Sequence, residues 1–173
     1  MARREIRLYP DPILRARCAR VEKVDRRIRR LAADMVEALH AAPGIGLAAP
    51  QVGEAIRLIV VDTSAGLDPD ELLILVNPEL VYAEGEAREE EACLSLPEVR
   101  EEVKRAALVR VRGLNLEGEK VRVRAEGLRA QVLQHEIDHL EGILFIDHLS
   151  RLKREVIKRR LKRPARACPA GAI

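Results

Sequence analysis

The chain has 173 residues, of which 47% are hydrophobic, and its 31 Lys and Arg against 28 Asp and Glu give a net charge of +3. This length fits one domain, and the apolar content is sufficient to bury a core without a disulfide or a structural metal. Because no apolar run reaches 18 residues and the N-terminal residues lack an apolar stretch, we expect neither a transmembrane span nor a secretory signal.

The first predicted element is a helix that follows Asp25. Apolar residues recur at helical spacing from residue 28 to residue 39, and the aspartate is a suitable N-cap. Pro43 and Gly44 would end this helix. The next ten residues, Gly44–Gly53 (GIGLAAPQVG), are too rich in Gly and Ala for an ordinary solvated loop.

Two short apolar runs, residues 55–62 and 72–76, predict strands separated by a loop. We expect Asn77 and Pro78 to end the second strand, because proline cannot donate to a strand ladder. Residues 80–83 and 86–90 are then expected to pair as a further hairpin.

The clearest alternation is found at residues 107–112 and 119–124, which predict a β-hairpin. Residues 125–140 change to a helical pattern that Gly142 would end, and residues 147–163 predict a basic C-terminal helix. This order predicts an α+β fold in which antiparallel strands surround the helix at 125–140, with one helix at each end of the chain.

The strongest chemical signal is the motif HEIDH at residues 135–139. His135 and His139 are four residues apart and therefore lie on one helix face, where two imidazoles can share one metal ion. Glu136 would lie close enough to act on a water molecule at that metal. The alternative is a charged helix turn with two incidental histidines, which this pairing around a glutamate makes the weaker interpretation.

A third protein ligand separates the competing interpretations. A metzincin-type protease would have a third histidine where this chain has Phe145, so that pattern fails. A metallopeptidase could instead use a downstream carboxylate such as Glu155, in the basic C-terminal segment. Cys93 is the better third ligand, because a thiolate with two imidazoles suits Zn²⁺ or Fe²⁺ and leaves a fourth position for water.

Three segments in the correct order resemble the motifs of the peptide deformylase family: Gly44–Gly53, Glu91–Pro97 (EACLSLP) and Gln134–Gly142 (QHEIDHLEG). Residues 9–15 are similar to the start of that family as well. The resemblance spans residues 5–150 and implies hydrolysis of N-formyl-methionyl peptides to formate and a free amine.

The resemblance also implies roles for individual residues. One divalent metal per chain, natively Fe²⁺ with Zn²⁺, Ni²⁺ or Co²⁺ as substitutes, would be held by Cys93, His135 and His139. Glu136 would be the general base and then the general acid. The oxyanion hole would be formed by the Gln51 side chain and the Leu94 backbone N–H, and Gly46 would offer backbone groups to an extended peptide.

Further residues near these motifs have both a functional and an ordinary interpretation. Glu91 is either a surface charge or a hydrogen-bond partner beside the metal. Arg100 is either an exposed strand charge or a substrate contact. Leu128 and Val132 share a helix face with His135, so they either fill the core or line the methionine pocket.

Two positions depart from the expectation for this family. Ala92 stands where the family usually has glycine, and a positive φ there would strain alanine by about 1 kcal/mol or more. Gln131, near the presumed pocket, is more polar than expected and could alter the preference for the first side chain of the substrate.

The charge of the chain is unevenly distributed. Residues 151–166 contain nine Lys or Arg and one Glu, so they contribute +8 and the rest of the chain has a net charge of −5. We expect a catalytic domain at residues 1–150, with the basic helix and tail at 151–173 as part of the same domain. The basic segment is either a solvated face or a contact with ribosomal RNA.

Composition narrows the partners and the compartment. Only three aromatic residues are present, which disfavours base stacking as the main function, and we expect no specific DNA and no membrane partner. Cys18, Cys93 and Cys168 are an odd number spaced far apart, which favours the reducing cytoplasm. A ribosome- or RNA-binding deformylase-like protein with weak catalysis, and an HExxH metallopeptidase, are the alternative functions.

Overall fold

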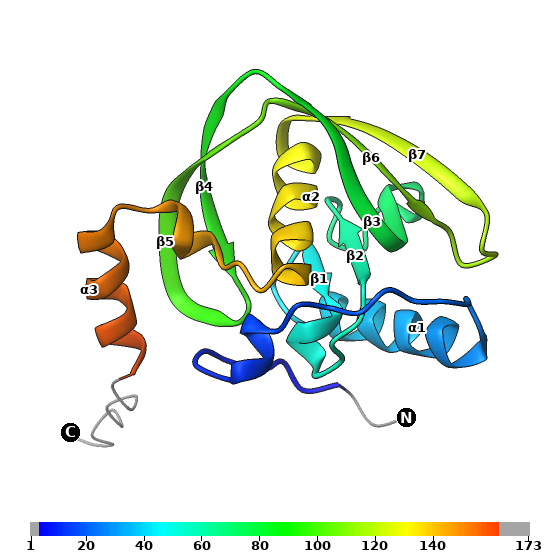
Figure 1. Ribbon diagram of the computed structural model, residues 1–173, viewed down its shortest axis with the longest axis horizontal. Helices are drawn as coiled ribbons and strands as arrows, with labels where there is room; N and C mark the ends of the chain where they lie inside the picture. Colours follow the sequence, from blue (N-terminus) through cyan, green and yellow to red (C-terminus); the bar gives the residue numbers. More distant parts are fainter. Residues whose placement is uncertain (1–3, 163–173) are drawn as a thin grey trace.

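Two antiparallel sheets lie around one central helix in the computed structural model, which describes residues 4–162 (Figure 1). The larger sheet has the order β1-β2-β3-β6-β7, and the smaller one pairs β4 with β5. The strands are β1 (Gly46–Ala48), β2 (Leu58–Asp62), β3 (Leu72–Glu84), β4 (Ala87–Cys93), β5 (Leu96–Arg105), β6 (Leu108–Leu114) and β7 (Lys120–Glu126). The α-helices are α1 (Arg26–Ala41), α2 (Gly127–Leu140) and α3 (Arg151–Leu161), and 3₁₀ turns are η1 (Pro12–Arg15), η2 (Ala49–Val52), η3 (Pro69–Glu71) and η4 (Phe145–His148).

Helix α1 confirms the predicted N-terminal helix. The side chain of Asp25 accepts a hydrogen bond from the backbone N–H of Ile28 at 3.0 Å, which caps the first turn. Leu31, Met35 and Leu39 follow at helical spacing and are buried against β1 and β2. This face of α1 therefore closes one side of the core.

Helix α2 is the central element and is buried on most of its surface. It contacts strands β1, β2, β3, β6 and β7, and its buried residues include both apolar side chains and the polar motif 134–136. Gly142 has a φ of +73°, and a Cβ there would collide with the backbone of Arg15. The predicted glycine stop is thus explained by both conformation and close approach.

Strand β3 continues past the point where the sequence predicted its end. Asn77 adopts a φ of +52°, and the pairing of β3 with β6 shifts register between Val76 and Glu79. A bulge of this kind tolerates Pro78, because the missing N–H falls where the ladder is interrupted. The Asn77 side chain bonds both the N–H and the C=O of Val21 at 2.8 Å.

The predicted hairpin between residues 80–83 and 86–90 is wrong. Residues 79–84 of β3 pair with β6, whereas β4 pairs with β5 from Ala87↔Arg105 to Ala92↔Arg100. The turn after Cys93 brings β5 next to β4, and these two strands form the smaller sheet. The predicted β6–β7 hairpin is confirmed, with Val111 opposite Val123.

Helix α3 confirms the predicted C-terminal helix within the described residues. Ser150 caps it, and the buried Ile157 packs in a cluster with Leu14, Val99 and Phe145. The helix thereby contacts β5 and η4, so it is attached to the smaller sheet (Figure 1). Among the helices within residues 4–162, none has both the length and the apolar character that a membrane span requires. Cys168 and the end of the basic segment lie outside the described residues.

Candidate metal centre and its pocket

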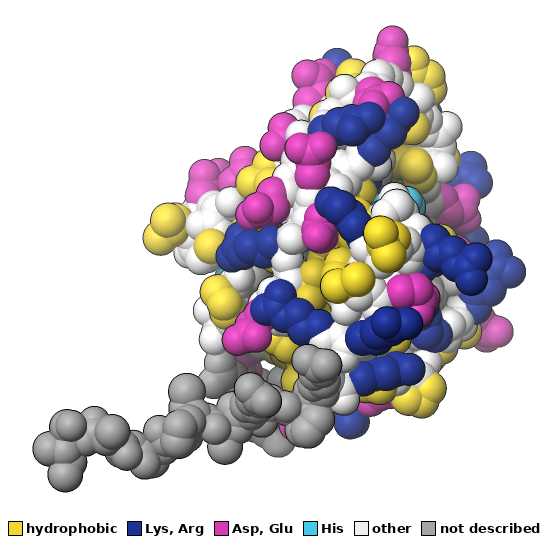
Figure 2. All heavy atoms as spheres, turned by 90° about the vertical axis from the view of Figure 1, so that its left-hand side faces the viewer, with side chains coloured by type: hydrophobic (Ala, Val, Ile, Leu, Met, Phe, Trp, Pro, Cys, Tyr) yellow, Lys and Arg dark blue, Asp and Glu magenta, His cyan; other side chains and the backbone are white. Residues whose placement is uncertain are grey.

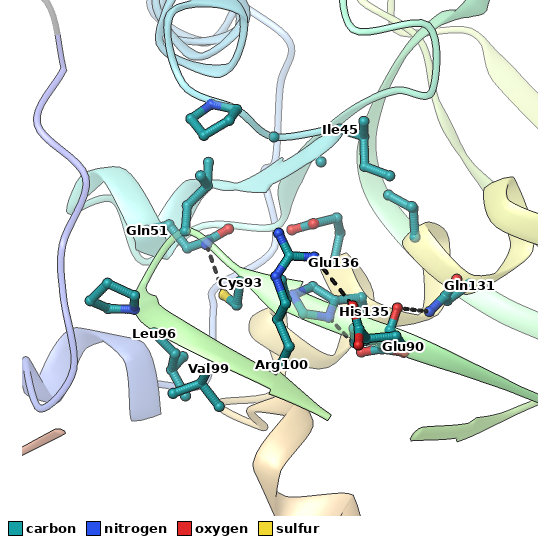
Figure 3. Close-up of a pocket in the computed structure, with 18 of the residues that line it drawn as sticks. Ile45, Gln51, Glu90, Cys93, Leu96, Val99, Arg100, Gln131, His135 and Glu136 are labelled. Atoms are coloured by element: carbon teal, nitrogen blue, oxygen red, sulfur yellow. Dashed lines mark hydrogen bonds and ion pairs between the residues drawn. The ribbon is translucent and has the colours of Figure 1, made fainter. Parts of the chain in front are cut away.

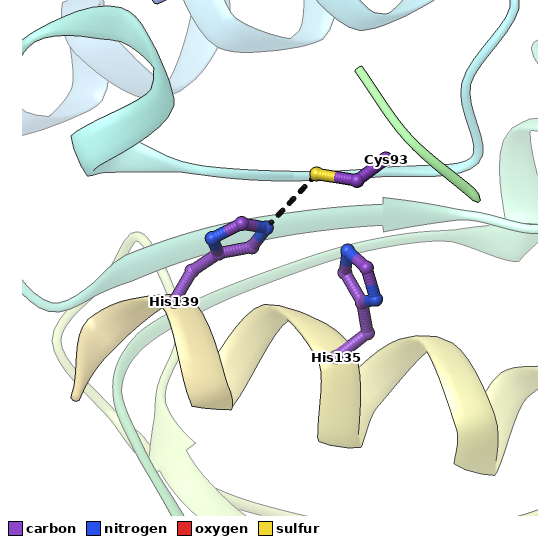
Figure 4. Close-up of side chains that lie close together, drawn as sticks. All are labelled: Cys93, His135 and His139. Carbon is purple, nitrogen blue, oxygen red and sulfur yellow. Dashed lines mark hydrogen bonds between the residues drawn. The ribbon is translucent and has the colours of Figure 1, made fainter. Parts of the chain in front are cut away.

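Cys93, His135 and His139 meet in the interior (Figure 4). Cys93 ends β4, and the two histidines lie one turn apart on α2. Their potential ligand atoms all lie within 4.8 Å of one another, and Cys93 Sγ is 3.4 Å from His139 Nε2. All three side chains are buried. The structure therefore brings together the three residues that the sequence predicted as ligands.

Glu91 fixes the orientation of His135. Its Oε2 lies 2.8 Å from His135 Nδ1, so Nε2 is the ring nitrogen left for a metal. Burial by itself raises the pKa of Glu91, but hydrogen bonds and charges from His135 and Arg105 outweigh it and lower the pKa to about 2. The carboxylate is therefore ionised at neutral pH and accepts a hydrogen bond from the Nδ1–H of His135.

Arg105 is a buried cation that the sequence reasoning missed. Its Nε and Nη2 donate to Glu91 at 2.7 and 3.1 Å, and its Nη1 donates to Asp138 at 2.7 Å. His148 Nε2 lies 2.7 Å from the same Asp138 oxygen. The sequence does contain one signal for its burial. Side chains alternate between the two faces of a strand, and Arg105 falls on the same inward face of β5 as Val99 and Val103.

We expect Arg105→Met to damage both the fold and the metal site. Glu91 would remain buried without its cation, a loss that costs about 3–5 kcal/mol in the free energy of unfolding. Metal affinity should fall by about 10–100-fold, because His135 loses its oriented partner. Urea denaturation and competition with a chelator measure the two effects. Arg122→Met, at an exposed position on β7, should change neither, and equal effects of both variants would contradict this role.

Glu136 faces the pocket beside the cluster (Figure 3). Its Oε2 is buried and has no hydrogen-bond partner among residues 4–162. Burial, followed by the negative charge of Glu91, raises its pKa to about 7 against the opposing charge of His135. A carboxylate with such a pKa can take up and return a proton at neutral pH.

Gln51 is positioned by its own loop and directs its amide towards the cluster (Figure 3). Its Oε1 accepts the backbone N–H of Ala48 at 2.8 Å, and its Nε2 lies 3.1 Å from Ser95 Oγ and 3.5 Å from Cys93 Sγ. The first bond fixes which end of the amide is the oxygen. An N–H donor is therefore held beside the cluster, as an oxyanion hole requires.

Gly46 is a glycine because α2 approaches β1 closely. A Cβ at this position would lie 2.7 Å from Val132 Cγ1 and would also overlap Glu136. The absent side chain therefore lets the backbone of β1 reach the pocket next to the catalytic candidate Glu136.

The pocket has a volume of about 560 Å³, and its walls come from β4, β5, α2 and the segment before β1. Leu94, Arg100, Leu128 and Val132 all line it, so the position of each is compatible with the functional interpretation. Val132 also belongs to the core, whereas Leu128 is half exposed. Arg100 is exposed and paired with Glu90 at 3.3 Å. Its guanidinium is thus near the pocket and accessible.

Ala92 carries none of the strain that a positive φ would cause. It lies in β4, opposite Arg100, and is not among the non-glycine residues with positive φ in the described chain. Its side chain is exposed and lines the pocket. The methyl group therefore adds bulk to the wall without distorting the strand that carries Cys93.

The donor set fits one catalytic divalent cation. A thiolate and two imidazoles are three protein ligands, which is the number typical of sites that keep a position open for chemistry. Burial and the charge of His135 lower the pKa of His139, which keeps that imidazole neutral. Glu155, the ligand of the metallopeptidase alternative, is half exposed on α3 and pairs with Lys158.

Comparisons with known proteins agree with this geometry. A sequence model described as "Polypeptide deformylase" matches residues 3–155. The chain is 51% identical over 168 residues to the peptide deformylase of Phenylobacterium zucineum, covering 96% of this chain and 99% of the relative. It is 48% identical over 164 residues to that of Acidobacterium capsulatum, covering 95% and 96%. The fold is similar to the crystal structure of a peptide deformylase from Legionella pneumophila, with a TM-score of 0.87, 44% identity and coverage of 92% and 94%.

Proposed function

The chain belongs to the polypeptide deformylase family, and from this premise we propose that it hydrolyses the N-formyl group of nascent polypeptides that begin with formyl-methionine. The observation that carries the proposal is the buried cluster of Cys93, His135 and His139 next to Glu136 in an open pocket. The products are formate and a free amino terminus. We place the reaction in the cytoplasm, where nascent chains are made and a ligand thiol stays reduced.

Three residues would hold the metal. Cys93, His135 and His139 supply the donors, and Glu91 with Arg105 keeps the imidazole of His135 oriented. A divalent cation bound there supplies Lewis acidity, which lowers the pKa of water and polarises the formyl oxygen. We propose Fe²⁺ as the native ion, with Zn²⁺, Ni²⁺ or Co²⁺ as substitutes, because thiolate and imidazole donors suit all four.

The reaction proceeds through proton transfer by Glu136. The carboxylate takes a proton from the attacking water as the new C–O bond forms at the formyl carbon. Gln51 Nε2 and the backbone N–H of Leu94 donate to the oxygen of the tetrahedral intermediate. Glu136 then returns the proton to the leaving nitrogen as the C–N bond breaks. The reaction consumes one water and releases one formate and one free amino terminus.

The substrate lies in the pocket as an extended chain. Gly46 lets its own backbone groups approach the substrate, because no Cβ fits between β1 and α2. Arg100 reaches a substrate carbonyl from the rim, and Leu128 and Val132 contact the first side chain. These roles rest on the position of each residue in the pocket wall.

Formate release from a formyl-Met peptide tests this proposal. Protein loaded anaerobically with Fe²⁺ should release one formate per free amino terminus formed. Mass spectrometry of the products separates the proposal from the metallopeptidase alternative, which would cut an internal peptide bond. A peptide cleaved internally, with its formyl group retained, would contradict the proposed function.

We propose the ribosome as a further partner, bound through helix α3. This helix packs against β5 and η4, which supports our proposal that it belongs to the catalytic domain; residues 163–173 lie outside the described residues. On the face that Figure 2 shows, Lys and Arg side chains lie among exposed apolar and acidic ones. Leu152 is 76% and Val156 57% exposed, and Arg151 and Arg159 are exposed beside them. We propose that this basic face contacts ribosomal RNA through phosphates.

We expect the double variant R151E/R159E to bind ribosomes at least about tenfold more weakly, with a salt dependence reduced by about one unit for each phosphate that is no longer bound. Sedimentation with ribosomes at several salt concentrations measures both. The charge-matched control K120E/R122E alters β7, on the other sheet, and should retain the affinity. An equal loss in both variants would indicate an unspecific effect of net charge.

A further inference from the structure

Gln131 is a buried polar residue in the wall of the substrate pocket. It is 7% exposed and lies on α2, one turn before His135. The neighbouring wall residues Ile45, Leu128 and Val132 are all apolar. The wall formed by α2 therefore carries the carboxamide of Gln131 one helical turn, a rise of about 5.4 Å, before the metal-ligand candidate His135.

The orientation of this carboxamide is fixed by one contact. Gln131 Nε2 donates to the backbone carbonyl oxygen of Glu90 at 3.2 Å (Figure 3). Only the nitrogen can donate to a carbonyl, so the contact also identifies which end is the oxygen. Nε2 keeps a second hydrogen, and no residue of the described chain, 4–162, donates to Oε1. Hydrogen-bonding capacity thus remains in the pocket wall.

The first side chain of a substrate decides whether this capacity is used. A hydrocarbon side chain that covers Gln131 shields the carboxamide from solvent and offers no hydrogen-bond partner in return. A thioether is only a weak acceptor. A sulfoxide oxygen is a strong acceptor at the same position along the side chain, so it can take the second N–H of Nε2.

On the basis of the proposed function, we propose that Gln131 is a specificity-determining residue that adapts the pocket to first side chains ending in a hydrogen-bond acceptor. Methionine sulfoxide, the oxidised form of an initiator methionine, is the substrate class that this chemistry recognises. The enzyme would then remove formate from oxidised as well as intact formyl-methionine, and it would disfavour a hydrocarbon of equal length.

The test compares two peptides that differ only in the first residue, formyl-methionine sulfoxide and formyl-norleucine. The measured quantity is the ratio of the kcat/KM values for the two peptides. Because both peptides are assayed with the same preparation, the fraction of protein that is folded and metal-loaded cancels in this ratio. Gln131→Met keeps the length of the side chain and removes both hydrogen-bonding groups. We expect the sulfoxide-to-norleucine ratio to fall by at least about tenfold in this variant. Gln131→Leu should lower the sulfoxide-to-norleucine ratio as well.

Gln134→Met is the matched control, because this second buried glutamine of α2 bonds Ala106 and Ala130 and does not line the substrate pocket. Its ratio should equal that of the wild type. An unchanged ratio in both Gln131 variants, with formyl-Met peptide still cleaved, would overturn the role of Gln131 alone. Failure of the wild type to release formate from formyl-Met peptide would overturn the proposed function and this inference with it.

Discussion

Glu136→Gln is expected to lower kcat for formate release by about 10²–10⁴-fold, the usual contribution of a general acid–base residue. The amide has nearly the shape of the carboxylate but cannot accept the proton of the attacking water. Glu136 is not one of the three clustered ligand candidates, so the variant should retain bound metal. Steady-state kinetics on a formyl-Met peptide and metal analysis of the same sample measure the two quantities.

Glu155→Gln is the control for the loss of one carboxylate. This residue is half exposed on α3 and outside the pocket, so its kcat should equal that of the wild type. If Glu136→Gln releases formate as fast as the wild type with metal bound, Glu136 is not the proton-transfer residue, and the proposed mechanism is wrong.

Cys93→Ala is expected to remove the metal and the activity together. Loss of one of three protein ligands should weaken metal binding by at least about 100-fold, because the two imidazoles alone must then hold the ion. Metal content after gel filtration and competition with a chelator measure this change. The fold should persist, because Cys93 is a small side chain at the end of a strand.

Cys18→Ala provides the matched comparison. Cys18 is also a buried free cysteine, but it packs between core residues, and burial raises its pKa to about 11. A thiol with this pKa stays protonated at neutral pH and is a poor ligand. Metal content should be unchanged in this variant. Full metal content in Cys93→Ala, or its loss in Cys18→Ala, would contradict the assignment of Cys93.

The two histidines of the candidate metal site could be predicted from the sequence because their signal is short-range. His135 and His139 lie on one helix turn, and this spacing alone brings them together. Cys93 comes from β4 in the smaller sheet and not from α2, and its choice depended on ligand chemistry and on the family motif rather than on local pattern. Gln51 is likewise far from α2 in sequence, so only the folded structure gives its contact with Cys93 at 3.5 Å.

Long-range pairing explains what the sequence did not predict. Asn77 and Pro78 are ordinary signals for the end of a strand, yet a bulge absorbs both and β3 continues. Strand β4 then joins β5, which no local pattern specified. Arg105 was missed for the same reason: a charged residue on a strand is normally exposed, and only its partners Glu91 and Asp138 make its burial possible.

The most direct test of the account is a metal-dependent measurement of formate on wild-type protein. The same preparation is assayed with a formyl-Met peptide after loading with Fe²⁺, after removal of the metal by a chelator, and after reloading. We expect equal amounts of formate and free amine in the loaded samples and neither product in the chelated one. Formate release that is independent of the metal, or no formate from any loaded sample, would contradict the account.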